Sequence, residues 1–254
     1  MTEFSDRRIP VGKVPPDLLR RLLDLPAKED PDVVVGPRPG EDAAVLRPGS
    51  RLLVVSSDPI TFATPRPGWY SVHVNANDLA VMGAAPRFFV LTVMMPPETT
   101  EKQTAAVVRQ AADAAASLGV TIVGGHTEVT EAVTTPVVSG TMLGPLVAAR
   151  PCSSANAQPG DTVLQISPMA VEGTSILAHE HREELSSSGF TSEELDRAAA
   201  FLEDPGLSVV APAQLLNREI EVHAMHDPTE GGLATGLREI ASASDHGMRV
   251  FEDR

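Results

Sequence analysis

Apolar residues along the first 150 positions gather in short runs, separated by longer stretches with helical spacing. Short runs rich in Val, Leu and Ile and bounded by Pro, Gly or Asp are typical of β-strands. Such runs predict strands at 33–36, 43–46, 51–58, 87–95, 120–125 and 137–147. Apolar residues three and four apart predict helices at 15–25, 68–84 and 100–119. The last is the clearest helix, because Thr100 and Gln103 form a capping-box pattern and Gly119 stands where a helix ends.

A second part of the chain follows a segment rich in Pro, Ser, Asn and Gly at 151–161, which predicts a domain boundary. We therefore expect two domains, at 1–150 and 151–254. In the second, the pattern predicts strands at 161–167 and 221–225 and helices at 172–184, 192–202, 208–218 and 231–243. Charged residues crowd 180–204, which predicts a helical excursion into solvent. Because strands and helices do not alternate one to one, we predict a mixed α+β fold.

Composition is typical of a globular protein and excludes several classes of function. Hydrophobic residues make up 42% of the 254 residues, enough for a sizeable core. Acidic residues outnumber basic ones by 34 to 20, and the net charge of −14 would repel the phosphate backbone of a nucleic acid. No apolar run is long enough to cross a bilayer, and the N-terminus lacks the layout of a signal peptide. Cys152 is the single cysteine, so we expect a cytoplasmic protein without an internal disulfide, and no nucleic-acid or membrane partner.

Carboxylates stand at the ends of predicted strands and inside one predicted helix. Glu41 and Asp42 precede a strand, Asp58 ends the next strand, and Asp78 lies in the helix at 68–84. Taken singly, each has a structural explanation as a turn or cap residue. Several buried carboxylates in one place would repel each other unless a cation lay between them. Hard oxygen donors without cysteine partners suit Mg²⁺ rather than zinc.

Two polar segments leave their roles open. The predicted strand at 120–125 ends in Gly124 and Gly125, followed by His126, and glycine permits either close approach to a ligand or a positive φ. His126 has no Cys or His partner at zinc-site spacing, so a structural, hydrogen-bonded histidine is the alternative. Asn75 and Asn77 would either contact a nucleotide or satisfy backbone groups at a buried helix start.

The chain carries sequence motifs that, in this order, resemble one superfamily. The motifs are GEDAAVL at 40–46, VVSSDPI at 54–60, NANDLAVMGAAP at 75–86, VGGHTEVT at 123–130 followed by SGTMLG at 139–144, and HDPTEGGL at 226–233. They resemble the AIR synthase-like (PurM-like) superfamily, which includes aminoimidazole ribonucleotide synthase, thiamine-monophosphate kinase, selenophosphate synthetase and the hydrogenase maturation protein HypE. NANDLAVMGAAP is the most specific of them. Their wording is nearest to the AIR synthase-related and HypE-like proteins.

The resemblance implies a fold, cofactors and site residues. It implies an N-terminal domain that forms a dimeric β-barrel with flanking helices in a homodimer, and a C-terminal α/β domain that is short or truncated in this chain. ATP would lie in a groove between the domains and the partner chain, with Mg²⁺ held by Asp42, Asp58 and Asp78. Asp58 and Asp227 would be the catalytic residues. The nucleotide-site residues would be Gly40, Asn75, Asn77, Gly124, Gly125 and His126.

The implied function is ATP- and Mg²⁺-dependent activation of a substrate oxygen, or phosphate transfer to a small acceptor, as in HypE-like proteins. A small-molecule substrate or a maturation partner protein is expected. The sequence departs from its relatives at two places, of which the first weakens the thiamine-monophosphate kinase interpretation. His126 replaces the aspartate that kinase relatives carry in VGGDT, and no cysteine follows Cys152, although HypE ends in a cysteine. The alternatives are a non-catalytic ATP-binding or assembly protein and a thiamine-monophosphate kinase-like phosphotransferase.

Overall fold

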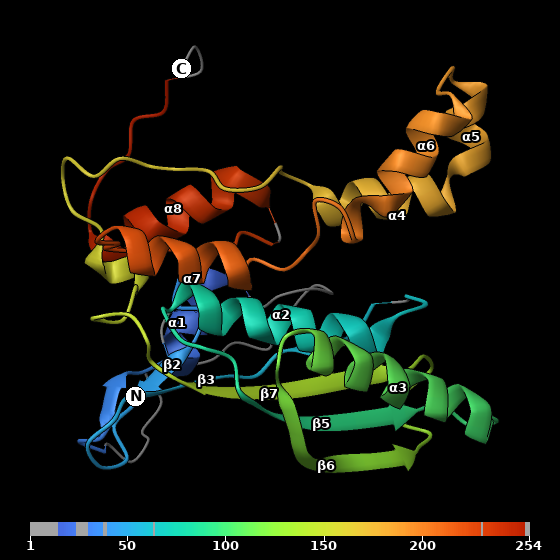
Figure 1. Cartoon of the computed structure of the whole chain (residues 1–254), viewed down its shortest axis with the longest axis horizontal. Helices are drawn as coiled ribbons and strands as arrows, with labels where there is room; N and C mark the ends of the chain where they lie inside the picture. The colour runs from blue at the N-terminus through green and yellow to red at the C-terminus, as the bar shows by residue number, and fades with distance from the viewer. Residues whose placement is uncertain (1–14, 24–29, 38–39, 63, 230, 252–254) are drawn as a thin grey trace.

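The first part of the chain forms one seven-stranded sheet covered by helices on one face (Figure 1). The computed structural model describes residues 15–23, 30–37, 40–62, 64–229 and 231–251. The strands are β1 (Val33–Val35), β2 (Ala44–Leu46), β3 (Leu53–Ser56), β4 (Pro59–Ile60), β5 (Phe88–Met95), β6 (Thr121–Val129) and β7 (Val137–Pro145). Their order is β1-β2-β3-β7-β5-β6, and β4 pairs with β7. β5 and β6 run parallel, whereas the other pairs are antiparallel.

Helices α2 (Pro67–Val81) and α3 (Glu101–Ser117) pack on that sheet, and α1 (Pro16–Leu23) is a short helix near the start of the described chain. Alternate residues of β5, from Phe89 to Met95, are buried against the two helices. α2 is buried on nearly all sides, because the sheet lies under it and α7 of the second part packs over it (Figure 1). Side chains of α2 are therefore held between the two parts of the chain.

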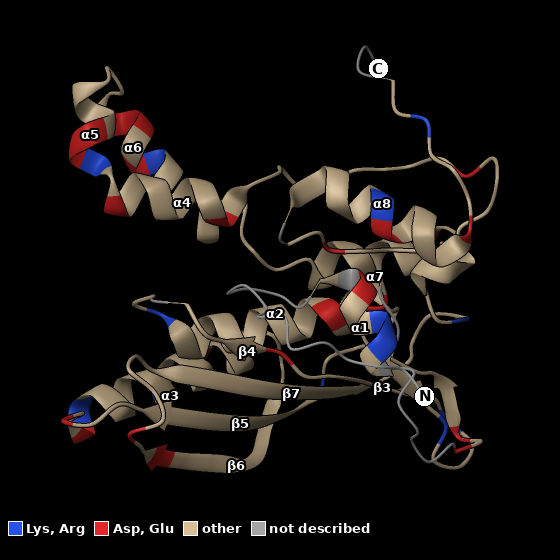
Figure 2. Ribbon diagram, turned by 180° about the vertical axis from the view of Figure 1, so that it is seen from behind, with Lys and Arg blue, Asp and Glu red and all other residues tan. Residues whose placement is uncertain are grey.

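The second part is helical in the described residues. Its elements are η1 (Ser154–Asn156), α4 (Val171–Glu180), α5 (Arg182–Ser187), α6 (Ser192–Ala199), η2 (Ala200–Leu202), α7 (Val210–Glu219) and α8 (Gly232–Ser244). Helices α4, α5 and α6 project away from the rest of the molecule, and α5 and α6 carry acidic and basic segments side by side (Figure 2). This agrees with the predicted excursion into solvent at 180–204.

The strands predicted at 161–167 and 221–225 were wrong. Neither segment is a strand in the structure. Val163 and Leu164 are 60% and 62% exposed, and no described strand lies beside them. An isolated extended segment has no ladder to satisfy its backbone groups, so apolar composition alone does not make it a strand.

The other predicted elements match described strands and helices within a few residues. Both hydrogen bonds of the capping box at Thr100 and Gln103 are present, which confirms that prediction. Residues 24 and 25 of the first predicted helix lie outside the described residues. The sheet of one chain is open, with no closed barrel among the described strands. Within the described ranges, no helix is long and apolar enough to span a membrane.

Candidate functional site

Carboxylates that are far apart in the sequence meet beside the ends of β2 and β3. The two strands are antiparallel neighbours, with Ala44 opposite Val55, so Asp42 and Asp58 emerge at the same edge of the sheet. Asp78 reaches this edge from α2, where Ser56 Oγ at the end of β3 donates to Asp78 Oδ2 at 2.5 Å. Asp227 joins them from the second part of the chain. We call Asp42, Asp58, Asp78 and Asp227 the carboxylate cluster.

Burial and like charges raise the pKa values of two carboxyls of the cluster, Asp78 and Asp227. Burial raises the pKa of Asp78 well above its usual value, and the charge of Asp227 raises it further, against the hydrogen bond from Ser56. Burial and then the charge of Asp42 raise the pKa of Asp227 to about 8. Asp58 raises both pKa values, although its own side chain is exposed. The cluster therefore holds more negative charge than its environment stabilises.

His226 is a residue of this site that the sequence analysis missed. Its ring bridges two carboxylates, with Nδ1 2.8 Å from Asp42 Oδ2 and Nε2 2.7 Å from Glu239 Oε2 on α8. Burial lowers the pKa of His226, but the hydrogen bonds and charges of Asp42, with Glu239 and Asp227, outweigh burial and raise it to about 9. The imidazole is therefore protonated near neutral pH and offsets part of the negative charge. The sequence feature that could have identified His226 is its position next to Asp227 in the HDPTEGGL motif.

Asn75 and Asn77 have backbone partners in the structure. Asp58 N donates to Asn75 Oδ1 at 2.9 Å, and Asn75 Nδ2 donates to the carbonyl oxygens of Asp58 and Ser71 at 3.1 and 2.8 Å. Asn75 thus fixes the backbone of Asp58. Asn77 Nδ2 donates to Leu207 O at 3.0 Å, and its Oδ1 accepts from Val209 N at 2.9 Å. Of the two open explanations, these bonds favour the structural one: Asn75 positions a cluster residue, and Asn77 ties α2 to the second part of the chain.

The loop at Gly40 and Glu41 approaches the same site from β2. Gly40 lies against α8, where a Cβ would sit only 3.2 Å from the carbonyl oxygen of Glu239. Ser153 Oγ donates to Glu41 Oε1 at 2.5 Å, so this loop is joined to the segment between the two parts of the chain. Gly40 is therefore placed next to the cluster, and Glu41 is engaged in a structural contact.

Gly124, Gly125 and His126 lie on the edge strand β6, away from the cluster. Gly140 N donates to Asp58 O, Gly140 pairs with Leu91, and Leu91 pairs with Gly125. Three strand spacings therefore separate Asp58 from Gly125, roughly 14 Å. A Cβ on Gly125 would lie 1.7 Å from Leu91 O, so close packing against β5 explains why this position is a glycine. His126 is exposed and pairs with Glu128 at 3.1 Å, so one chain does not bring these residues to the carboxylate cluster.

The donor set of the cluster fits a hard divalent cation. Asp42 and Asp227 each offer a carboxylate oxygen, and these two atoms and a ring nitrogen of His226 all lie within 4.8 Å of one another. The protonated His226 acts there as a counter-charge and not as a ligand. Carboxylate oxygens are the ligands that Mg²⁺ prefers, and they come here from elements that are otherwise far apart in the chain. A cation would also relieve the repulsion that raises the pKa values of Asp78 and Asp227.

Fold and site together define a two-domain α+β protein in which acidic residues from both parts of the chain gather in one cluster. Comparison with known families gives a narrower identity. The pattern of the AIR synthase related protein N-terminal domain matches residues 40–146, and that of the corresponding C-terminal domain matches residues 158–254. The chain therefore belongs to the AIR synthase related protein family, which confirms the resemblance read from the motifs.

Curated relatives of the chain carry several names. It is 29% identical to a putative hydrogenase expression/formation protein of Methanocaldococcus jannaschii, over 84% of this chain and 62% of that protein. It is 32% identical to carbamoyl dehydratase HypE of Cupriavidus necator, over 85% of this chain and 60% of that protein. A selenide, water dikinase of Nitratidesulfovibrio vulgaris is 31% identical to the chain, over 93% of this chain and 66% of that protein. The chain thus spans less than two thirds of the length of each of these relatives.

Solved structures share the fold. A chain of the HypE–HypF complex superimposes with a TM-score of 0.65 at 26% identity, over 81% of this chain and 65% of that chain. HypE in complex with ATP superimposes with a TM-score of 0.62 at 26% identity, over 89% of this chain and 61% of that chain. Thiamine monophosphate kinase from Aquifex aeolicus superimposes with a TM-score of 0.64, over 90% of this chain and 71% of that chain. Its sequence identity is 15%, so this likeness shows a shared fold alone. The two-domain PurM-like architecture is therefore established for this chain.

Proposed function

We propose that the carboxylate cluster binds Mg²⁺ together with the triphosphate of ATP. The observation that carries this proposal is the convergence of Asp42, Asp58 and Asp78, from two neighbouring strands and the helix above them, on one site. Burial and the neighbouring carboxylates raise the pKa of Asp78 at this site. These three residues would hold the metal. Asp42 would exchange its contact with His226 for the metal, and Asn75 would keep Asp58 in place. Bound there, the cation would offset the charge of the phosphate oxygens.

The chemistry we propose is ATP-dependent activation of a substrate oxygen, or transfer of phosphate to a small acceptor. In support, one structural relative is described in complex with ATP, and curated relatives are named a carbamoyl dehydratase and a dikinase. Asp227 belongs to the second part of the chain yet lies within the cluster, and we propose that it acts with Asp58 on an acceptor bound by the second domain. The residues that orient the acceptor would contribute the rest of the catalysis, since positioning and charge stabilisation dominate such reactions.

The proposed function also gives a role to a second copy of the chain. β5 and β7 bury alternate residues against the helices, and their other residues form an open face of the sheet that no described helix covers. β6 is the edge strand and has exposed Val123 and Val129. We propose that this open face pairs with its copy in a homodimer. Gly124, Gly125 and His126 would then approach a nucleotide bound by the partner, because within one chain they lie too far from the cluster.

The dimer can be tested with an arginine on the open face. Thr92, in the middle of β5, is half-buried and faces away from the helices. Thr92→Arg places a charge in the proposed interface, which is costly to desolvate without a partner. Light scattering should give about twice 26.8 kDa for the native protein and for the control Asp113→Arg on the exposed side of α3, and 26.8 kDa for Thr92→Arg. A native protein of monomer mass would contradict the dimer.

Metal dependence tests the proposed site by thermal unfolding. Mg-ATP at about a hundred times its dissociation constant should stabilise the fold by about 3 kcal/mol, which raises the Tm by about 6–10 °C in a protein of this size. EDTA should remove this increase, since the nucleotide would lose the cation that joins it to the carboxylates. ATP that raises the Tm equally with and without Mg²⁺ would contradict a metal-bridged site.

A further inference from the structure

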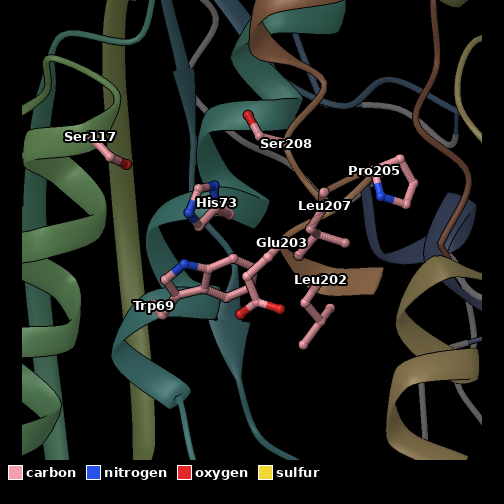
Figure 3. Close-up of a pocket in the computed structure, with 9 residues that line it drawn as sticks. Trp69, His73, Ser117, Leu202, Glu203, Pro205, Leu207 and Ser208 are labelled. Atoms are coloured by element: carbon pink, nitrogen blue, oxygen red, sulfur yellow. The ribbon is translucent and has the colours of Figure 1, made fainter. Parts of the chain in front are cut away.

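A pocket separate from the carboxylate cluster lies where α2 and α3 face the segment that precedes α7 (Figure 3). Its volume is about 350 Å³. Trp69, His73 and Ser117 line it from the first part of the chain, opposite the segment from Leu202 to Ser208. Figure 3 shows Trp69 and His73 on neighbouring turns of α2, facing Glu203 and Leu207. No residue of the carboxylate cluster lines this pocket.

Helix geometry separates the pocket from the cluster. His73 and Asn77 are four residues apart and lie on one face of α2. Asn77 on this face holds Leu207 and Val209, so the opposite wall of the pocket is fixed by two hydrogen bonds. Asp78 is rotated from Asn77 by about 100°, toward β3, where Ser56 binds it. The pocket and the cluster are therefore on different faces of the same helix.

His73 gives the pocket an unsatisfied polar group. Only 7% of this residue is exposed, and its Nδ1 is buried without a hydrogen-bond partner among the described residues. Burial, followed by the nearby charge of Arg66, lowers the pKa of His73 to about 4. The ring is therefore neutral at physiological pH, with one nitrogen able to donate and the other able to accept. Leaving a buried polar atom unpaired is costly, so a ligand that reached this nitrogen would offset that cost.

Trp69 gives the pocket an aromatic wall. The ring centroids of Trp69 and His73 are 4.1 Å apart with an interplanar angle of 45°. The guanidinium carbon of Arg66 lies 4.3 Å from the centroid of the Trp69 ring, and Arg66 forms an ion pair with Glu203. This ion pair joins α2 to the facing segment. Glu203 also lines the pocket, so its carboxylate disfavours an anionic ligand.

We propose that this pocket binds an uncharged, planar nitrogen heterocycle that stacks near Trp69 and exchanges hydrogen bonds with His73. The volume suits a ligand of one or two rings, since ligand pockets begin at about 300 Å³. Planar rings match the indole wall. A ligand that both donates and accepts hydrogen bonds matches the neutral imidazole and the carboxylate of Glu203. This site is distinct from the proposed ATP site and would take a different molecule.

Benzimidazole is the probe for the test, because it is bicyclic, uncharged above neutral pH, and has one donor and one acceptor nitrogen. Trp69 is the only tryptophan in the chain, so its fluorescence reports on the pocket directly. We expect benzimidazole to change the Trp69 fluorescence in a saturable way, with a dissociation constant of about 1–10 mM, as for a fragment-sized ligand. Benzoate, a planar anion, should give no saturable change. Absence of saturation by benzimidazole would overturn the proposal.

Two variants locate the probe. His73→Phe keeps an aromatic ring but removes the hydrogen-bonding nitrogens, and it should weaken benzimidazole binding at least about tenfold. Ser117→Phe, at an exposed position of α3, fills the pocket from its rim without disturbing the core and should weaken binding similarly. His181→Phe, at an exposed position beside α5, is the matched control and should bind as the native protein does. Binding that survives both pocket variants, or that Mg-ATP displaces, would overturn a separate site.

Discussion

Asp58→Asn is expected to weaken Mg-ATP binding at least about a hundredfold in isothermal titration, since one charged metal ligand is lost. The side chain of Asp58 is exposed, and Asn75 holds its backbone through hydrogen bonds that asparagine at position 58 would keep. The variant should therefore fold normally, and the loss would come from the metal site itself.

Asp113→Asn is the matched control for this titration. Asp113 is an exposed aspartate on α3, and it lies outside the carboxylate cluster. Its substitution changes the net charge by the same amount and should leave Mg-ATP binding unchanged. Equal binding by the native protein and by Asp58→Asn would contradict the assignment of Asp58 as a metal ligand.

Gly68→Ala is expected to destabilise the fold by at least about 3 kcal/mol in chemical denaturation. A Cβ at Gly68 would lie 2.1 Å from the carbonyl oxygen of Val107, so α2 and α3 would have to move apart. Because α2 carries Asp78, this movement would also disturb the carboxylate cluster, and the remaining folded protein should bind Mg-ATP more weakly.

Gly173→Ala provides the comparison for this prediction. Gly173 is exposed in α4, and a Cβ there would meet no atom within 4 Å. Alanine favours helix more than glycine does, so this variant should be neutral or more stable by up to about 1 kcal/mol. A Gly68→Ala variant as stable as Gly173→Ala would contradict the close packing of α2 on α3.

Most of the first part of the fold could be predicted from the sequence, because its signals are local. The capping box at Thr100 and Gln103 and the apolar runs of β5 and β7 each specify one element with little help from the rest of the chain. The sheet order could not be predicted in this way. β7 lies between β3 and β5, which depends on contacts between residues far apart in sequence.

Apolar runs in the second part were misleading. Val163 and Leu164 have the composition of a strand, but a strand forms only where a neighbour pairs with it. No such neighbour is present among the described residues, and the segments at 161–167 and 221–225 are irregular. The apolar pattern of these two segments therefore could not show that a neighbouring strand was missing.

The candidate site was only partly readable from the sequence. The positions of Asp42 and Asp58 at strand ends indicated that these two gather, because neighbouring strands bring their ends together. Asp78 joins them from α2, which the strand pattern does not predict. The bridge from His226 to Asp42 joins residues 184 positions apart, and no spacing rule predicts it. For Asn75 and Asn77 the sequence left two explanations open, a nucleotide contact or a structural role, and only the structure shows that their amides bond backbone groups of the chain itself.

The position of the cation is the most direct test of the account. Crystals grown with Mn²⁺ in place of Mg²⁺ and a non-hydrolysable ATP analogue would locate the metal by its anomalous scattering. We expect the strongest peak in contact with carboxylate oxygens of Asp42, Asp58 and Asp78, and phosphate oxygens on its other side. A nucleotide bound with its metal away from these three residues would contradict the central claim.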